Sequence, residues 1–301
     1  MKPRRIRAAI AVLLALLQPL GAAPSWSRPP DRARAPHPAL WVVHGRQGTV
    51  WLFGTIHALP PHFEWENGAI HAAIAGSDRL VIEAVIDQAK DAGALLTLGT
   101  ATTPLPPITE RVAPRLRPAL AAMVAKSAVP AATLDRMKTW AAAMVLFGVT
   151  VSNLGVTSSQ GVEEQLKTEF HDAGKPVEGL ETLAQQLGFF DTLDEARQRE
   201  FLASVVDEKH DDAADFGKML AAWARGDERG ISASFDKEMK ANDTLRTVLL
   251  ARRNAHWADA LVKRLAMPGT QFVAVGAGHL TGADSVQAML ARLGYKAKRV
   301  Q

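Results

Sequence analysis

The sequence WLFGTIH at residues 51–57 decides the fold, because it joins an apolar strand to a glycine turn and a histidine. Gly54 follows the apolar residues, and glycine lets a chain turn sharply and approach a ligand closely. His57 then extends from the carboxyl end of the predicted strand, where ligands bind in open α/β sheets. The sequence FVAVGAGH at residues 272–279 repeats this order and ends in His279. The two units predict that two strand ends deliver two imidazoles to one site.

Outward from this stretch, the apolar pattern alternates between short strands and longer helices. We therefore predict an α/β fold with a central mixed β-sheet built from N- and C-terminal segments, flanked by helices, with a long helical middle section. The expected strands are 39–43, 49–53, 79–86, 175–182, 271–275 and 295–300, and the expected helices are 64–75, 161–173 and 284–293, with mainly helical pattern over 88–160, 183–225 and 231–265.

The first 38 residues differ from the rest of the chain. Basic residues at positions 2, 4, 5 and 7 precede an apolar run at 8–17, and small residues follow at 21–23. A run of about ten apolar residues suits a signal peptide, whereas a membrane span needs about 20. We predict a signal peptide at 1–23, with an uncleaved anchor as the alternative, and a disordered leader at 24–38. The domain at 39–301, with a helical insertion at about 88–265, is then expected in the periplasm or secreted.

The charge balance argues against a nucleic-acid partner. The chain has 35 basic and 31 acidic residues, and residues 1–23 contain four of the basic residues and none of the acidic ones. The remainder is formally neutral, so no electrostatic footprint for nucleic acid remains. The chain has no cysteine, which excludes disulfides, thiolate metal sites and a cysteine nucleophile.

A few side chains are candidates for chemistry. His57 and His279 each offer a lone pair to a metal or a base to a proton, although either can also be an ordinary turn residue. Glu83 lies within the predicted strand 79–86, where a buried carboxylate is costly unless it is paired or bound to a metal. The alternative is that Glu83 lies at a solvated strand end. An arginine in the helix at 231–265 could pair with such a carboxylate or bind a substrate carboxylate or oxyanion, and we expect Arg252 at the surface.

Several segments, taken together and in this order, resemble the TraB/GumN family, which is related to the Tiki proteases. The resemblance runs from about residue 39 to 300. The segments are LWV at 40–42 with WLFGTIHALP at 51–60, GKPV at 174–177 with GLET at 179–182 and Gln186, LL at 249–250 through RN at 253–254 to Trp257, and FVAVGAGHL at 272–280 through Gly282.

The resemblance implies an α/β fold akin to erythromycin-esterase-like and ChaN-like proteins. Tiki members are metal-dependent proteases that use two G-x-x-H motifs, a glutamate and an arginine. Carried over to this chain, these residues are His57, His279, Glu83 and Arg253. The family often has an acidic residue two places after the glutamate, where this chain has Val85.

The preferred hypothesis is an exported hydrolase that cleaves an amide bond in a peptide or protein with a metal-activated water. His57 and His279 bind a zinc, manganese or cobalt ion, and Glu83 is a third ligand or the general base. Arg253 steadies the oxyanion or Glu83. The expected surrounding residues are Glu181, Asn254 and His62.

Other hypotheses remain open at this stage. One is a metal-free hydrolase with a histidine as general base, as in the esterase-like relatives. Another is a haem- or small-ligand-binding protein of ChaN-like type, since histidine ligates haem iron. A third is an inactive scaffold that keeps the fold.

Overall fold

The computed structural model describes residues 35–86, 91, 93, 97–207, 212–239 and 246–301. The predicted signal peptide at 1–23 and most of the predicted leader at 24–38 lie outside these residues. Among the described residues, no helix combines the length and apolar character needed to cross a membrane.

A six-stranded mixed sheet forms the centre of the fold, with the strand order β4-β3-β5-β2-β1-β6. Its members β4, β3, β5 and β2 are parallel to their neighbours, whereas β1 is antiparallel to both β2 and β6. The predicted mixed sheet from both ends of the chain is confirmed. The strands are β1 Leu40–His44, β2 Gly48–Thr55, β3 Arg79–Ala84, β4 Val177–Glu181, β5 Gly269–Gly276 and β6 Ala297–Arg299.

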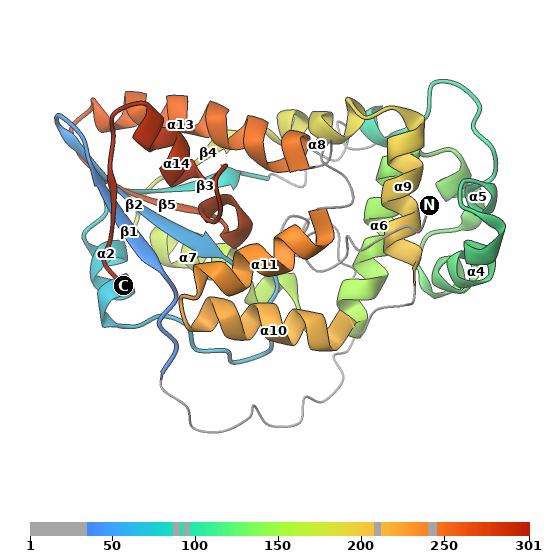
Figure 1. Cartoon of the computed structure of the whole chain (residues 1–301), viewed down its shortest axis with the longest axis horizontal. Coiled ribbons are helices and arrows are strands. Elements are labelled where there is room, and N and C mark those ends of the chain that lie inside the picture. Colours follow the sequence, from blue (N-terminus) through green and yellow to red (C-terminus); the bar gives the residue numbers. More distant parts are fainter. Residues whose placement is uncertain (1–34, 87–90, 92, 94–96, 208–211, 240–245) are drawn as a thin grey trace.

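Helices cover both faces of this sheet. One face packs on α13 (Arg252–Leu265) and α14 (Val286–Arg292), which lie above the sheet in Figure 1. The other face packs on α2 (Gly68–Ala75) and α7 (Val162–Asp172). Successive residues of a strand point to opposite faces, so a strand buried on both sides is apolar throughout. In β3, Leu80 and Ile82 accordingly pack toward α2 and α7, and Val81 packs toward α13.

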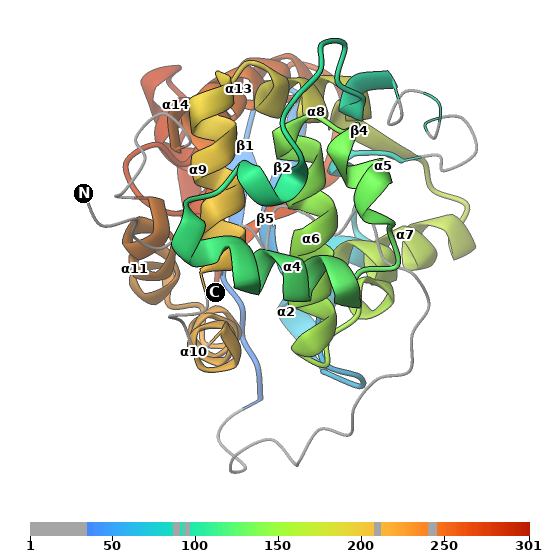
Figure 2. The ribbon, with the colours of Figure 1, turned by 90° about the vertical axis from the view of Figure 1, so that its right-hand side faces the viewer.

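The helical middle of the chain packs beyond one end of the sheet and beneath it (Figures 1 and 2). In Figure 1, α4, α5, α6 and α9 lie to the right of the sheet, and α10 and α11 lie below it. The helices are α4 Arg117–Lys126, α5 Ala131–Asp135, α6 Thr139–Asn153, α8 Leu183–Asp191, α9 Glu195–Val206, α10 Asp212–Ala224 and α11 Glu228–Met239, with a π-helical turn at Thr247–Ala251 and short 3₁₀ turns at Ile108–Glu110, Pro114–Leu116, Ser158–Gln160 and Ala277–Leu280.

The predicted helix at 183–225 is three helices. Thr182 caps α8 with a capping box that includes Gln185, and Asp194 caps α9 by accepting a hydrogen bond from the Arg197 backbone N–H. A new cap side chain starts a new helix because it satisfies amide groups that have no partner in the preceding turn. The apolar pattern alone does not reveal these breaks.

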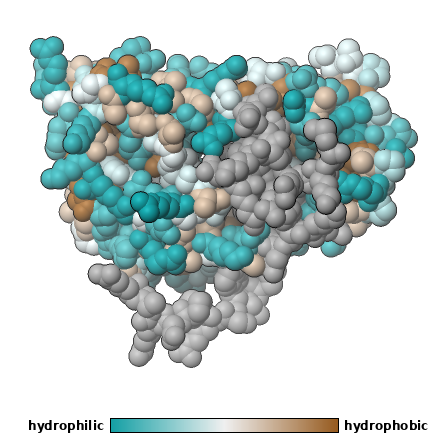
Figure 3. All heavy atoms as spheres, viewed as in Figure 1, coloured by the Kyte–Doolittle hydropathy of each residue, from teal (hydrophilic) through white to brown (hydrophobic). Residues whose placement is uncertain are grey.

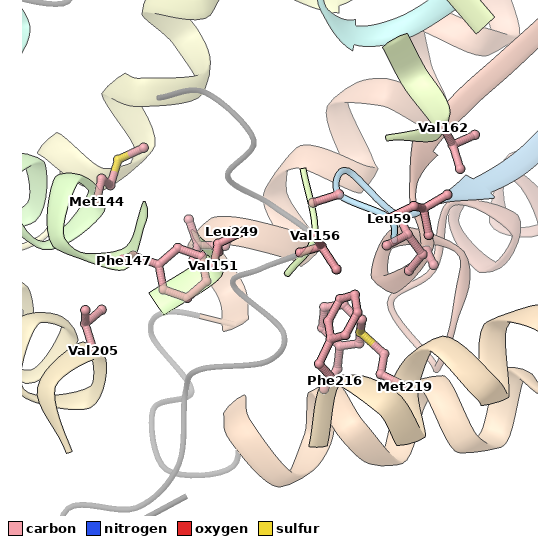
Figure 4. Packing of buried hydrophobic residues seen from close by; sticks show 14 of the residues in the cluster. Leu59, Met144, Phe147, Val151, Val156, Val162, Val205, Phe216, Met219 and Leu249 are labelled. Carbon is pink, nitrogen blue, oxygen red and sulfur yellow. The ribbon is translucent and has the colours of Figure 1, made fainter. Parts of the chain in front are cut away.

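The core joins the sheet to the helical middle in one large cluster of buried side chains. Figure 4 shows members of this cluster, among them Phe147 and Val151 from α6 and Phe216 and Met219 from α10. Helix α6 is apolar on all sides and buries most of its residues. On the outer face seen in Figure 3, apolar residues are scattered among hydrophilic ones.

Candidate functional site

The carboxyl ends of the four parallel strands bring the predicted site residues to one edge of the sheet. Strands β2 and β5 pair in register up to Thr55 opposite Gly276, so the two strand–glycine–histidine units end side by side. Glu83 is the second-last residue of β3. Glu181 ends the neighbouring strand β4, opposite Ala84 of β3. Parallel pairing therefore gathers residues that are up to about two hundred positions apart in the chain, in keeping with the usual ligand edge of such sheets.

Arg253 is the centre of a buried cluster of charges. Its side chain is 2% exposed, and Nη2 donates to Glu83 Oε2 at 2.6 Å and to Glu181 Oε1 at 2.5 Å. Its Nε also donates to Glu181 Oε1, at 3.1 Å, and Nη1 lies 3.2 Å from His279 Nε2. The Arg253 guanidinium stacks over the Trp257 ring, 4.6 Å from the ring centroid. Arg252, the preceding residue, is exposed, as expected.

Glu83 is 4% exposed and well satisfied as an anion. Besides Arg253, Oε2 accepts from Gln186 Nε2 at 3.1 Å, and Oε1 accepts from the backbone N–H of Gly276 at 2.8 Å. Burial is the largest single effect and raises the pKa of Glu83, but the Arg253 charge, the two histidines and the Gly276 amide together outweigh it. The pKa of Glu83 is thereby lowered to about 2, so this carboxylate is ionised.

Glu181 also contacts Arg253, but its pKa is shifted in the opposite direction to that of Glu83. Burial raises the pKa of Glu181 above its usual value, and the nearby Glu83 charge adds to this, although Arg253 and Trp257 Nε1 both donate hydrogen bonds to the carboxylate. The two carboxylates are therefore unequal, because one guanidinium charge compensates only one of them fully.

His279 is 1% exposed and held on both ring nitrogens. Nδ1 lies 2.5 Å from Asn254 Oδ1, an acceptor, which assigns the proton to Nδ1 and leaves Nε2 to accept from Arg253. The Asn254 side-chain amide in turn donates to the backbone carbonyl of Asp284 at 2.6 Å. Burial and the Arg253 charge, opposed by Glu83, lower the pKa of His279 to about 3. His279 is thus a neutral imidazole at physiological pH.

His57 belongs to a second group of contacts. Its Nδ1 lies 2.6 Å from Glu163 Oε1, and the Thr55 hydroxyl donates to the same oxygen. His57 Nε2 is buried and has no hydrogen-bond partner. Burial is the largest single effect and lowers the pKa of His57, but the charge and hydrogen bond of Glu163 together with the Glu83 charge outweigh it, so this pKa is raised above its usual value. The charges of Glu83 and Arg253 also act on the His57 pKa, so the two groups of contacts are neighbours.

Glu163 is the site residue that the sequence alone did not single out. It lies in the first turn of α7, directly before Glu164, and both are ordinary choices at a helix N-terminus. Only the packing of α7 against the end of β2 distinguishes the carboxylate that meets His57 from the one that does not.

Of the other residues expected around the site, two lie in the buried cluster and one does not. Glu181 and Asn254 both lie in the buried cluster. His62 is exposed, on a turn where its φ is 59°, so the structure does not bring it into this cluster. Val85, which replaces the acidic residue of the family pattern, is 44% exposed beyond the end of β3.

The predicted metal site has suitable donors but not a ready arrangement. Two imidazoles and a carboxylate would suit zinc, manganese or cobalt. Here, however, Glu83 accepts from Arg253 and from Gly276, and His279 Nε2 faces Arg253. Within the described part of the chain, His57, Glu83 and His279 do not form a set of ligand atoms that all lie within 4.8 Å of one another. In this arrangement Arg253 Nη1 faces the Nε2 lone pair that His279 would offer to an ion.

A second set of donors lies at the surface, away from these residues. Glu66, His71 and Glu169 place one ligand atom each within 4.8 Å of one another, and His71 Nδ1 lies 2.6 Å from Glu66 Oε1. The His71 side chain is 65% exposed. The exposed position of this group gives it no part in the buried cluster.

Comparisons with known proteins identify the family to which the chain belongs. The family model described as the TraB/PrgY/gumN family matches residues 39–299. The uncharacterized protein YbaP of Escherichia coli (strain K12) and that of Shigella flexneri are each 28% identical over 151 residues, which is 50% of this chain and 55% of each relative. The matched region thus spans about half the length of these curated relatives. No solved structure matches the chain. Since the family model covers most of its length, the chain belongs to the TraB/PrgY/gumN family.

Proposed function

We propose that this protein is a hydrolase that activates water at His57. The observation that carries this proposal is the unpartnered, buried His57 Nε2 at the carboxyl ends of the parallel strands. A buried ring nitrogen without a hydrogen-bond partner lowers the stability of the folded protein. Such an atom therefore suggests a place where a ligand binds.

In the proposed reaction, His57 Nε2 takes a proton from a water molecule as the water oxygen attacks a carbonyl carbon. The proton then passes from Nε2 to the leaving group when the tetrahedral intermediate collapses. The base must be neutral to act. The pKa of His57 is raised, so the fraction of protein with a neutral, active imidazole increases over a higher pH range than for an ordinary histidine.

Arg253, Glu83 and His279 have a supporting role in this proposal. The Arg253 guanidinium already donates to both carboxylates and faces His279, so it has little capacity left for a substrate oxyanion. This favours the second of the two roles expected for Arg253, namely holding Glu83. The ionised Glu83 and the positive Arg253 then provide a fixed field beside His57.

We further propose that the substrate is a peptide or protein and that the protein works outside the cytoplasm. Support for the substrate comes from the resemblance of the motifs to the Tiki proteases. Support for the location comes from the basic head, apolar run and small residues at positions 1–23.

The test measures kcat/KM of the full chain on a quenched fluorescent peptide library and on p-nitrophenyl esters. His57→Gln is expected to lose about 10²–10⁴-fold in kcat/KM, the usual contribution of a general base. His44→Gln, at an exposed position in the hairpin before β2, is the matched control and is expected to keep wild-type activity. Wild-type turnover in His57→Gln, or no turnover of either probe by the wild type with and without added divalent ions, would end the proposal.

A metal-assisted form of the same hydrolysis is the second candidate. It is favoured by the free His57 Nε2, which offers a lone pair, and opposed by the contacts of Arg253 with Glu83 and His279. A bound ion would polarise water or the substrate carbonyl. Metal analysis of the purified protein distinguishes the two forms. About one equivalent of zinc, manganese or cobalt in the wild type, lost in both His57→Gln and His279→Gln, would support the metal-assisted form.

A further inference from the structure

We propose that Glu163 is the positioning residue of His57, which holds the imidazole with its proton on Nδ1 and turns Nε2 as an acceptor toward a hydrogen-bond-donating ligand. This inference rests on the proposed function for its turnover measurement only. The tautomer and orientation of the His57 ring can be tested without any measurement of catalysis.

The contacts of Glu163 determine the tautomer. Its Oε1 lies 2.6 Å from His57 Nδ1 and also accepts from the Thr55 hydroxyl. An ionised carboxylate only accepts hydrogen bonds, so Nδ1 must carry a proton to make this contact. In the neutral ring the other nitrogen, Nε2, is then an acceptor.

The backbone at the start of α7 holds Glu163 in this place. Val162 N–H donates to the backbone carbonyl of Ile56 at 3.1 Å, which docks the first turn of α7 on the segment that carries His57. A Cβ atom at Gly161 would lie only 2.0 Å from the His57 carbonyl oxygen, so this close approach requires glycine. The dock and the glycine together aim the Glu163 side chain at the imidazole.

The neighbouring carboxylate shows that this placement is specific. Glu164, one residue further along the same turn, pairs with Lys167 at 2.5 Å, and its side chain is 50% exposed. The Glu163 side chain is 12% exposed. Glu163 and Glu164 are therefore alike in sequence position, and only the packing of the fold places Glu163 against His57.

Two unpartnered atoms define the chemistry of the ligand. His57 Nε2 and Glu163 Oε2 are both buried without a hydrogen-bond partner, and both are acceptors in the proposed state. Their natural complement is a group that donates, such as water, a hydroxyl or an amide N–H. A carboxylate or phosphate group that only accepts would face the Nε2 lone pair of the neutral ring and is a poor fit. A hydrolytic water meets this requirement.

The test of the tautomer is long-range ¹H–¹⁵N correlation of the full-length protein labelled with ¹⁵N-histidine. His57→Gln identifies the His57 signals by their loss. In the wild type, at a pH where the ring is neutral, the proton is expected on Nδ1. Glu163→Ala is expected to shift the proton to Nε2 or to a rapidly exchanging mixture. Glu164→Ala, the matched control, is expected to leave the His57 signals unchanged.

Each outcome decides the proposal. A wild-type His57 with its proton on Nε2 overturns it without any variant, and so does a Glu163→Ala protein that keeps the wild-type tautomer. If Glu163→Ala does not fold, Glu163→Leu replaces it, because Leu fills much of the same space and offers no acceptor oxygen to Nδ1; a wild-type tautomer in that variant overturns the proposal as well.

Turnover adds a second, separate measurement. If the peptide or ester probe is turned over, Glu163→Ala is expected to lower kcat at least about tenfold with KM within about twofold, because the residue acts through His57. Glu163→Gln is expected to recover part of this loss. An unchanged kcat would overturn the positioning role. If instead no probe is turned over but the tautomer is as expected, the proposed function fails and the positioning stands.

Discussion

At the scale of single residues, Arg253 decides the electrostatics of the site. One guanidinium charge lies between two buried carboxylates, Glu83 and Glu181, and this group carries one negative charge in excess if both are ionised. The opposite directions of the two pKa shifts follow from this imbalance. Buried charges of this kind are expensive to uncover, because removing one partner leaves the other in a low dielectric without compensation.

Replacing Arg253 should therefore cost far more than replacing its neighbour. Arg253→Met is expected to lower the free energy of unfolding by about 3–5 kcal/mol, the usual cost of breaking a buried ion pair. Arg252→Met, at an exposed position of the same helix, is expected to change it by no more than about 0.5 kcal/mol. Urea unfolding followed by tryptophan fluorescence measures both. Equal effects of the two substitutions would contradict the buried network.

The Glu163 carboxylate should also set the pH dependence of activity. It raises the pKa of His57, and the proposed base is active only when neutral. Removing the charge in Glu163→Gln lowers this pKa, so the acidic limb of kcat/KM against pH should move to lower pH. Glu164→Gln should leave the limb in place, because Glu164 pairs with Lys167. A limb that moves to higher pH in Glu163→Gln would contradict the assignment of His57 as the base.

At the scale of elements, the site is made by strand ends and helix starts. Parallel pairing places the ends of β2, β5, β3 and β4 at one edge, so His57, His279, Glu83 and Glu181 follow from the topology. Helix α13 supplies Arg253 and Asn254 from the buried face of its first turn, which meets this edge. The first turn of α7 closes the other side with Glu163.

The dock of α7 can be tested with one methyl group. Gly161→Ala would place a Cβ 2.0 Å from the His57 carbonyl oxygen, so the start of α7 must shift and the Glu163 contact must weaken. We expect lower stability, by about 1–3 kcal/mol as for other overpacked sites, and lower activity. Gly188→Ala in α8, where a Cβ meets nothing within 4 Å, should be neutral or stabilising by up to about 1 kcal/mol. Thermal unfolding and turnover compare the pair, and a harmless Gly161→Ala would contradict the dock.

At the scale of the whole molecule, the buried titratable groups predict sensitivity to acid. The pKa of His279 is about 3 in the fold, against about 6.5 in an unfolded chain. Between these values the unfolded state binds a proton that the native state does not, so stability falls as the pH falls from about 6.5. Glu83, with a pKa of about 2, adds to the loss below about pH 4.5. His57 acts oppositely: its raised pKa contributes stability that is lost as the pH rises through that value.

The His279 contribution has its own signature. Between about pH 6 and 5 it should amount to about 1.4 kcal/mol of unfolding free energy per pH unit, the value for one proton. His279→Gln should flatten the slope of stability against pH in this window, whatever its effect on absolute stability. His256→Gln, at an exposed position of α13, should keep the wild-type slope. Urea unfolding at a series of pH values measures the slopes, and an unchanged slope in His279→Gln would refute the neutral buried imidazole.

The sequence by itself determined the fold class, the family and most of the buried cluster. The order of strand, glycine and histidine at residues 51–57 and 272–279 is a local pattern, and so is the carboxylate in the apolar strand β3. Local patterns of this kind can be recognised from the sequence without knowledge of the fold. The residues alone favoured a surface position for Arg252, whereas Arg253 was assigned to the site through the family resemblance. His62 follows His57 closely in the chain but is exposed, because closeness in sequence does not ensure closeness in space.

Only the tertiary structure decided which of the site residues contact one another. It joined Glu83, Glu181 and His279 to Arg253, and it gave His57 a separate partner, Glu163, from a helix about one hundred residues away. Which of two adjacent carboxylates meets an imidazole depends on the docking of α7 at Gly161, and therefore on packing between distant segments. A hydrogen bond of this kind forms over a few ångströms, and no periodicity along the chain records it.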